Sequence, residues 1–272
     1  MIKLTKKIIN AQIVAHLSQG KRGNKCRVGL WRIIRAIFKK LKTGMQWREL
    51  PMTELFGRHK YSWKTVFYYF SKWSKDGSWH RMWVALLKYH KNILDMSSIQ
   101  LDGSHTPAKR GGEAVCYQGR KKSKTSNMLF LTDRQGIPLA CSNPISGNHN
   151  DLYEIEKNVC KIMDTLKQSN IEVEGLFMNA DAGFDGKKLR DICSELEIVA
   201  NFDTNKRNAK ENTLADYYFD DLLYKQRFVV ERTNAWLDGF KNLIIRYETK
   251  TKHWLGFHYL AFSVILLRKV MN

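Results

Sequence analysis

The sequence predicts a small, basic, all-helical domain followed by an α/β domain, and two observations support this division. The first is charge: residues 1–98 contain 21 Lys and Arg against 4 Asp and Glu, whereas residues 99–272 contain 25 against 22. The second is a change near Ile99, from amphipathic helical patterns to short β-like runs separated by turn residues. We therefore expect one domain over residues 1–95 and another over residues 96–272.

The net charge of +20 favours a polyanionic partner. Double-stranded DNA fits this charge, and RNA stays open on charge alone, because phosphate contacts carry little sequence information. No lipidation site or basic helix with an exposed apolar face points to a membrane surface. No stretch approaches the roughly 20 uncharged apolar residues of a membrane span, so we expect a soluble, cytoplasmic protein associated with the nucleoid. The five cysteines form no CxxC pair and no zinc-ligand spacing, which favours reduced thiols.

Apolar residues at helical spacing indicate three helices in the basic part. The first covers residues 30–41, has Lys and Arg on its outer face, and ends at Gly44. The second covers residues 63–73, and the third covers residues 79–94. Their aromatic residues fall at core spacing, so we expect them to pack inside the domain. Short helices with a basic surface suit a helix-turn-helix-like DNA-binding domain.

The second part alternates between strand and helix patterns. This alternation predicts an α/β layered domain. The expected elements are a strand over 98–101, a hairpin of 127–132 with 137–141, a helix over 151–168, a strand over 175–180, a helix over 187–197, a helix-to-strand transition over 195–201 and a helical segment over 224–237.

Three acidic residues are placed by these elements. Asp102 follows the first strand directly, and Asp181 follows the strand over 175–180. Acidic residues at two strand ends are a common way to bring carboxylates together, and Glu231 in the last helical segment supplies a third. Three carboxylates can hold a pair of Mg²⁺ ions, which activate a water or 3′-hydroxyl and stabilise the leaving oxygen at phosphorus.

These residues resemble the DDE transposases of bacterial insertion sequences, in the IS-four/IS-five superfamily. The resemblance covers nearly the whole chain and implies a ribonuclease H-like catalytic fold, with Asp102, Asp181 and Glu231 as the first, second and third acids. It implies metal-dependent DNA cleavage and strand transfer, with Mg²⁺ or with Mn²⁺ as its substitute. The matching motifs are Gly44-Met45-Gln46-Trp47-Arg48, Trp63-Lys64-Thr65-Val66-Phe67-Tyr68-Tyr69-Phe70, Leu101-Asp102-Gly103-Ser104, Ala180-Asp181-Ala182-Gly183-Phe184-Asp185 and Val230-Glu231-Arg232-Thr233-Asn234-Ala235-Trp236-Leu237.

The same resemblance implies a Tyr-x2-Arg-x3-Glu-x6-Lys pattern that contacts DNA. Tyr224, Arg227 and Glu231 satisfy its first three positions, but Asp238 occupies the lysine position. Either Lys241 substitutes for that lysine, or the phosphate contact is made elsewhere. Arg227 lies one turn before Glu231, so it can face the same phosphate as the metal ions; otherwise it forms a surface ion pair.

Each acid also has an alternative interpretation. Asp102 taken alone fits a turn residue before Gly103, and Glu231 taken alone fits a surface residue beside Arg232. Asp181 competes with Asp185, which precedes the helix over 187–197 and is better placed to cap it. We choose Asp181 because it comes directly after the apolar strand.

Further polar residues are secondary candidates. His149 lies in a polar loop and could position water or DNA, and Asp151 after it is expected to be the N-cap of a helix. The run that contains Arg120, Lys121 and Lys122 is typical of a solvated loop, but beside an acidic metal site it could track the DNA backbone.

The resulting hypothesis is a transposase that binds the terminal inverted repeats of an insertion sequence, cuts DNA and joins the 3′-hydroxyl ends to target DNA. Both steps are in-line displacements at phosphorus, so no protein nucleophile is needed. A homo-oligomer is expected because two ends must be brought together. The rivals are a nuclease of the same fold without strand transfer, and a catalytically inactive DNA-binding regulator derived from a transposase.

Overall fold

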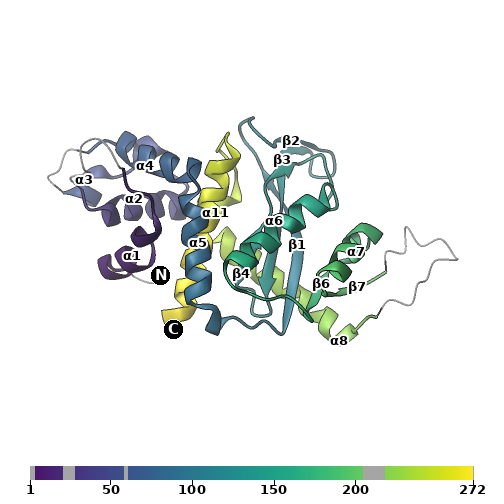
Figure 1. The fold of residues 1–272 in the computed structure, drawn as a ribbon. Coiled ribbons are helices and arrows are strands. Elements are labelled where there is room, and N and C mark those ends of the chain that lie inside the picture. Colours follow the sequence, from purple (N-terminus) through teal and green to yellow (C-terminus); the bar gives the residue numbers. More distant parts are fainter. Residues whose placement is uncertain (1–3, 21–27, 58–60, 205–217, 272) are drawn as a thin grey trace. The chain divides into compact units, whose positions relative to one another are not determined.

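The computed structural model describes residues 4–20, 28–57, 61–204 and 218–271, and the chain divides into two compact units (Figure 1). Unit 1 comprises residues 1–89, 108–113 and 237–272, and unit 2 comprises residues 90–107 and 114–236. These units divide the chain differently from the predicted domains, because unit 1 also takes in C-terminal residues. Among the cysteines, Cys26 lies outside the described residues, and no disulfide joins the four that the structure describes.

Unit 1 is helical, and the predicted helices are present in it. The second ends at Lys75, and Gly44 terminates the first in the left-handed conformation, with φ of 69°. The third ends at Tyr89, earlier than predicted, and a separate 3₁₀ turn follows at Lys91–Ile93 (η3) in unit 2. The helices of unit 1 are α1 (Lys6–Gln12), η1 (Val14–His16), α2 (Leu30–Thr43), η2 (Trp47–Glu49), α3 (Met52–Phe56), α4 (Trp63–Lys75), α5 (Ser78–Tyr89), α10 (Lys241–Ile244) and α11 (Thr251–Met271).

Helix α11 contacts α4 and α5 within unit 1. By length and composition it is apolar enough to cross a membrane, but its uncharged run between Lys252 and Arg268 is shorter than the span considered above. Its residues from His253 to Leu267 are nearly all buried among the other helices of the unit. A helix that is apolar on all sides is typical of the core of a folded domain as well as of a membrane.

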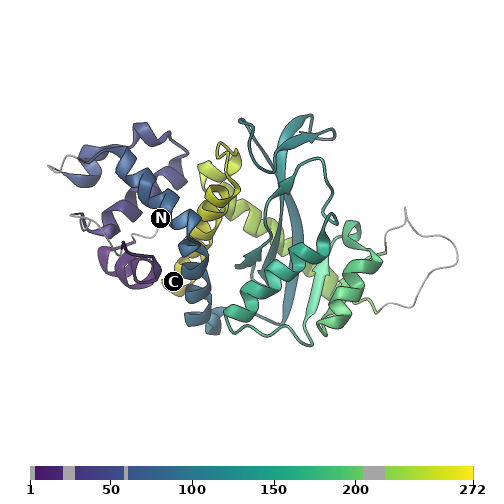
Figure 2. The ribbon, with the colours of Figure 1, turned by 45° about the horizontal axis from the view of Figure 1, so that its top comes forward.

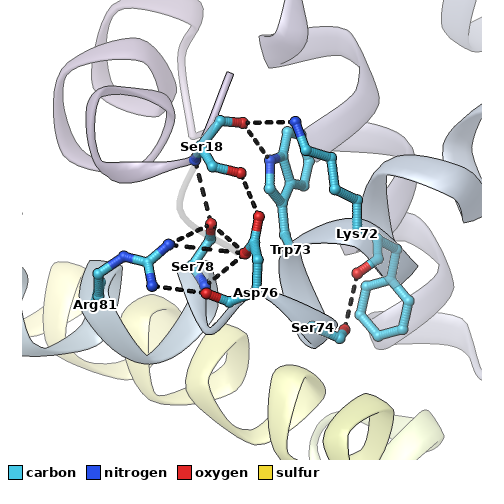
Figure 3. Close-up of polar contacts among 8 residues, drawn as sticks. Ser18, Lys72, Trp73, Ser74, Asp76, Ser78 and Arg81 are labelled. Carbon is cyan, nitrogen blue, oxygen red and sulfur yellow. Dashed lines mark hydrogen bonds and ion pairs between the residues drawn. The ribbon is translucent and has the colours of Figure 1, made fainter. Parts of the chain in front are cut away.

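The α4–α5 turn is held by a polar network (Figure 3). The Asp76 carboxylate accepts hydrogen bonds from the Ser78 backbone N–H at 2.9 Å, from the Ser78 hydroxyl at 2.6 Å and from the Ser18 hydroxyl. The Ser18 carbonyl in turn accepts a hydrogen bond from the Trp73 indole N–H at 2.9 Å. The network therefore ties the segment after η1 to the start of α5.

Unit 2 is the predicted α/β layer. Its sheet has the strand order β2-β3-β1-β6-β7, with β4 and β5 also paired to β3; β1 is antiparallel to β3, whereas β1, β6 and β7 run parallel. Figure 2 shows α6 lying across the strands. The strands are β1 (Ser98–Pro107), β2 (Cys116–Gln118), β3 (Ser123–Asp133), β4 (Pro138–Cys141), β5 (Ile145–Ser146), β6 (Phe177–Ala180) and β7 (Val199–Phe202). The helices are α6 (Ile155–Gln168), η4 (Ala182–Phe184), α7 (Lys187–Glu195), α8 (Asp221–Tyr224), η5 (Lys225–Phe228) and α9 (Val229–Asp238), whose last two residues belong to unit 1.

Three local predictions are wrong. Asp102 lies within β1 rather than after it, because the strand continues to Pro107 by pairing with β3. Helix α6 begins at Ile155, and its N-cap is Glu154 instead of Asp151. The N-cap of α7 is Gly186, so Asp185 does not cap that helix.

Candidate active site

Asp102 and Asp181 follow the paired residues of the parallel strands β1 and β6 at the same spacing. The last paired residues of β1 and β6 are Gln100 and Asn179. Asp102 lies two residues beyond Gln100, and Asp181 lies two residues beyond Asn179. Because side chains alternate between the faces of a strand, Asp102 lies on the same face as Gln100. The two acids therefore occupy equivalent positions in the chain, each two residues beyond the paired stretch of β1 and β6.

A ladder of buried amide side chains supports this arrangement. The Asn179 Nδ2 donates to Gln100 Oε1 at 2.7 Å, and Asn201 Nδ2 of β7 donates to Asn179 Oδ1 at 2.7 Å. All three side chains are fully buried. The Asn201 amide also joins the backbone N–H and C=O of Asp220, directly before α8. The ladder thus links the strands that carry the acids to the segment that leads into α9.

Asp102 is in an environment that disfavours its ionised form. Burial raises the pKa of Asp102 to about 7; a hydrogen bond from the Gly103 backbone lowers it, and the charges of Asp151, Asp181 and Glu231 raise it. The structure therefore brings the three predicted acids into one electrostatic neighbourhood. Asp102 is only half-buried, whereas Asp181 and Glu231 are exposed.

Glu231 is positioned by the first turns of α9. The hydroxyl of Thr233 donates to the Gly136 carbonyl at 2.5 Å, and the Arg232 guanidinium donates to the Gln135 carbonyl at 3.3 Å. These contacts fix α9 against the β3–β4 turn. Arg232 therefore contacts this turn, and Glu231 on the same helix is left exposed.

Tyr224 and Arg227 form a packed pair in the chain before Glu231. The guanidinium carbon of Arg227 lies 4.9 Å from the ring centre of Tyr224 and 4.1 Å from that of Phe228. Its Nε is buried and has no hydrogen-bond partner among the described residues. Burial raises the pKa of Tyr224, Arg227 lowers it, and Asp203 and Asp181 raise it. The pair therefore lies within electrostatic reach of Asp181.

Asp185 has a structural partner. Its Oδ1 accepts a hydrogen bond from Nε of Arg190 at 2.8 Å and forms an ion pair with Nη2 at 2.8 Å, and the Arg190 side chain is 8% exposed. The same guanidinium donates to the carbonyl of Phe202 at 3.1 Å. The contacts of Asp185 thus connect α7 to the end of β7. Asp181 instead accepts only from the backbone of Gly183, at 2.7 Å, among the described contacts.

Asp151 is a residue that sequence reasoning assigned to a helix cap. Its carboxylate lies directly over Gly103 of β1, where a Cβ atom would overlap it, and it accepts from Asn127 Nδ2 at 2.6 Å. The Asn127 side chain is fully buried in β3. In the sequence, the glycine beside Asp102 was the available signal for a close contact at this position. Its proximity to Asp151 is a tertiary contact that no local pattern predicts.

The remaining candidates are spread over both units. Arg120, Lys121 and Lys122 form the exposed turn between β2 and β3, and Lys121 Nζ donates to the carbonyl of His105 at 3.4 Å. His149 is half-buried, with its ring stacked on Tyr153 at 3.6 Å between centroids. Asp238 and Lys241 belong to unit 1 and are exposed.

The donor chemistry of the three acids suits a hard divalent cation, because Mg²⁺ prefers carboxylate oxygens. Among the residues that the structure describes, no group of three or more His, Cys, Asp or Glu side chains could hold a metal ion as it stands. A metal ion shared by Asp102, Asp181 and Glu231 therefore requires these carboxylates to approach one another further.

Comparison with known proteins identifies two matching family models. A model described as a transposase of the IS4/5 family matches residues 9–83, and a transposase DDE domain matches residues 88–266. No curated protein sequence matches the chain.

Solved structures give a likeness of fold. A piggyBac transposase synaptic complex with hairpin DNA is 12% identical, with a TM-score of 0.52, over 97% of this chain and 74% of that chain. A Mos1 pre-cleavage transpososome is 10% identical, with a TM-score of 0.30, over 93% of this chain and 81% of that chain. The first likeness and the DDE domain fit the ribonuclease H-like fold expected for residues 96–272.

Proposed function

Because the chain belongs to the DDE transposase family, we propose that it binds the terminal inverted repeats of an insertion sequence, cleaves the DNA there and joins the ends to target DNA. The observation that carries the proposal is that Asp102 and Asp181 each follow two residues after the paired residues Gln100 and Asn179. The charge of Glu231 acts on Asp102 from α9. These two observations support a site to which three separate segments of the chain would each contribute one acid.

Asp102, Asp181 and Glu231 would hold Mg²⁺, or Mn²⁺ in its place. When bound, a pair of these ions activates a water or 3′-hydroxyl and stabilises the leaving oxygen at phosphorus. Arg227, stacked on Tyr224, presents a guanidinium whose Nε has no partner among the described residues, and it would bind a phosphate beside the reacting one.

Other parts of the chain would bind the DNA itself. The exposed β2–β3 turn with Arg120, Lys121 and Lys122 would follow the phosphate backbone. The basic helices of residues 1–95 would act as a helix-turn-helix-like module for the element ends, and residues 96–272 would act as the catalytic domain. Lys241 would take the phosphate contact that Asp238 cannot make. A homo-oligomer would hold two ends together.

The Asp181→Asn variant tests this proposal. We expect it to bind DNA of the element ends like the wild type but to lose Mg²⁺-dependent cleavage, because an amide is a poor ligand for a hard cation. The matched control is Asp191→Asn, an exposed aspartate on α7, which should cleave normally. Full activity in Asp181→Asn would remove this residue from the site and make Asp185 the alternative.

The wild-type reaction separates the proposal from its rivals on a denaturing gel. Joined products are expected from a transposase. Nicked DNA without joined products would indicate a nuclease, and binding without any cleavage in Mg²⁺ or Mn²⁺ would indicate a DNA-binding regulator.

A further inference from the structure

Unit 1 contains a hollow outside the acidic site. Its volume is about 690 Å³, and its walls come from α2, η2, α4 and the segment between α10 and α11, all of which belong to this unit. Pockets for small organic ligands measure roughly 300–1,000 Å³. A single nucleotide, with its base, sugar and phosphate, is a ligand of that size class.

Aromatic side chains form part of the wall. Trp63 at the start of α4 is half-buried, and no ring contact joins it to another aromatic side chain among the described residues. Trp47 of η2 packs on Phe67 and Phe70, with ring centres 5.4 and 5.2 Å apart. The sequence predicts that the aromatic stripe of α4, Trp63, Phe67, Phe70 and Trp73, packs in the core. Phe70 and Trp73 are buried, whereas Trp63 and Phe67, which line the hollow, are only half-buried.

The rim carries an excess of positive charge. Four exposed cations line the hollow, and none of them lies within 4 Å of a carboxylate in the described parts of the chain. The only acidic residue in the described lining is Glu248, whose charge acts on the buried Lys40. Burial lowers the pKa of His253 at the same hollow, and the charges of Lys250 and Lys75 lower it further. The four cations are Arg48, Lys75, Arg110 and Lys250.

We propose that this hollow binds one unpaired nucleotide of the DNA substrate. The base stacks on Trp63, and the adjoining phosphates lie among the cations of the rim. Aromatic faces combined with basic groups recognise single-stranded nucleic acid, because an unpaired base exposes its flat face whereas a paired base keeps it stacked. This inference rests on the proposed function, since it takes DNA as the ligand, and it adds a preference for DNA with an unpaired end.

A neighbouring hollow indicates where the DNA strand next to the bound nucleotide would run. It measures about 520 Å³ and shares Phe67, Ser71 and Lys75 with the first. Its lining adds Lys64 and Tyr68, both exposed on α4. The outer face of α4 therefore continues the combination of aromatic and basic side chains beyond the first hollow.

A binding experiment with the full chain tests the inference. Fluorescence anisotropy compares a blunt DNA duplex with the same duplex carrying a short unpaired 3′ overhang. We expect the wild type to bind the overhang duplex roughly tenfold more tightly, as for one stacked base. Trp63→Ala should bind both duplexes equally, Trp63→Tyr should keep the preference, and Tyr89→Ala, exposed on α5 outside both hollows, should match the wild type.

A charge variant tests the phosphate contacts. Arg48→Gln should lower the slope of log affinity against log salt for the overhang duplex by about 0.7, the value for one single-strand phosphate. Lys88→Gln, an exposed lysine on α5 outside the hollow, should leave this slope unchanged.

The outcomes separate this inference from the proposed function. Equal binding of both duplexes by the wild type, or an unchanged preference in Trp63→Ala, overturns the nucleotide site and leaves the proposed function standing. Loss of binding to both duplexes in Trp63→Ala and in Trp63→Tyr also overturns it, because stacking should survive in tyrosine. A wild type that binds neither duplex overturns the DNA-binding function and this inference with it.

Discussion

Asn179 of β6 donates a hydrogen bond to Gln100 of β1 at 2.7 Å, two residues before each strand reaches its catalytic candidate. We expect Asn179→Leu to destabilise unit 2 by about 2 kcal/mol or more, since it removes the donor to the buried Gln100 Oε1 and one of the two acceptors of Asn201 Nδ2. Urea unfolding measures this loss. Asn143→Ala, at an exposed position, is the control and should change stability little. An Asn179→Leu protein as stable as the wild type would show that the ladder contributes nothing.

The sequence alone predicts that Asp181 directly follows a strand, because the apolar run of β6 is short and local and ends at this acid. The position of Asp102 could not. Residues Gly103 to Pro107 carry no apolar alternation, and they form strand only because β3 pairs with them along their length. The amide ladder was equally hidden, since buried Asn and Gln on strands look like polar breaks until their partners on neighbouring strands are known.

Asp151 and helix α11 also show that local sequence cannot reveal contacts between distant parts of the chain. Asp151 before a helix fits a cap, and nothing local indicates that Gly103 leaves space for its carboxylate. Likewise, the apolar sequence of α11 could not be assigned to a core until α4 and α5 were seen to contact it. The sequence predicts helices and strands well where periodicity decides, and it fails where a distant contact decides.

Gly103→Ala tests the contact between β1 and Asp151. The added methyl group overlaps the Asp151 carboxylate, which the hydrogen bond from Asn127 holds in place. We expect a loss of roughly 1–3 kcal/mol in unfolding free energy, typical of overpacking. The loss should be clearly smaller when Gly103→Ala is made in an Asp151→Ala background, as measured by a double-mutant cycle. Equal losses in both backgrounds would mean that Asp151 is not the obstacle.

Asp76→Ala tests the network between α4 and α5. The variant removes the acceptor for both groups of Ser78 and for the Ser18 hydroxyl, so we expect unit 1 to lose about 1–2 kcal/mol. Thermal unfolding followed by circular dichroism detects the change. Glu54→Ala is the control, because its ion pair with Lys39 is 3.7 Å long and exposed, and such pairs contribute little. A loss no larger than that of Glu54→Ala would contradict the role of Asp76.

His258 in α11 predicts how stability changes in weak acid. Its side chain is buried, with Nδ1 at 3.0 Å from the Trp254 carbonyl. Burial lowers the pKa of His258 from 6.5 to about 4; the Trp254 carbonyl raises it, and Arg246 lowers it further. The unfolded chain therefore takes up a proton at a higher pH than the folded chain does. The stabilisation from the neutral ring is complete above pH 6.5 and is lost as the pH falls towards 4, by at most roughly 3 kcal/mol.

Urea unfolding at several pH values between 7 and 4 measures this loss. The His258→Leu variant cannot take up the proton, so its unfolding free energy should fall less steeply over the same interval. His16→Leu, at an exposed position, should retain the slope of the wild type. If His258→Leu and the wild type fall in parallel, other groups must account for the acid sensitivity, because removing the His258 ring would then have had no effect on proton uptake.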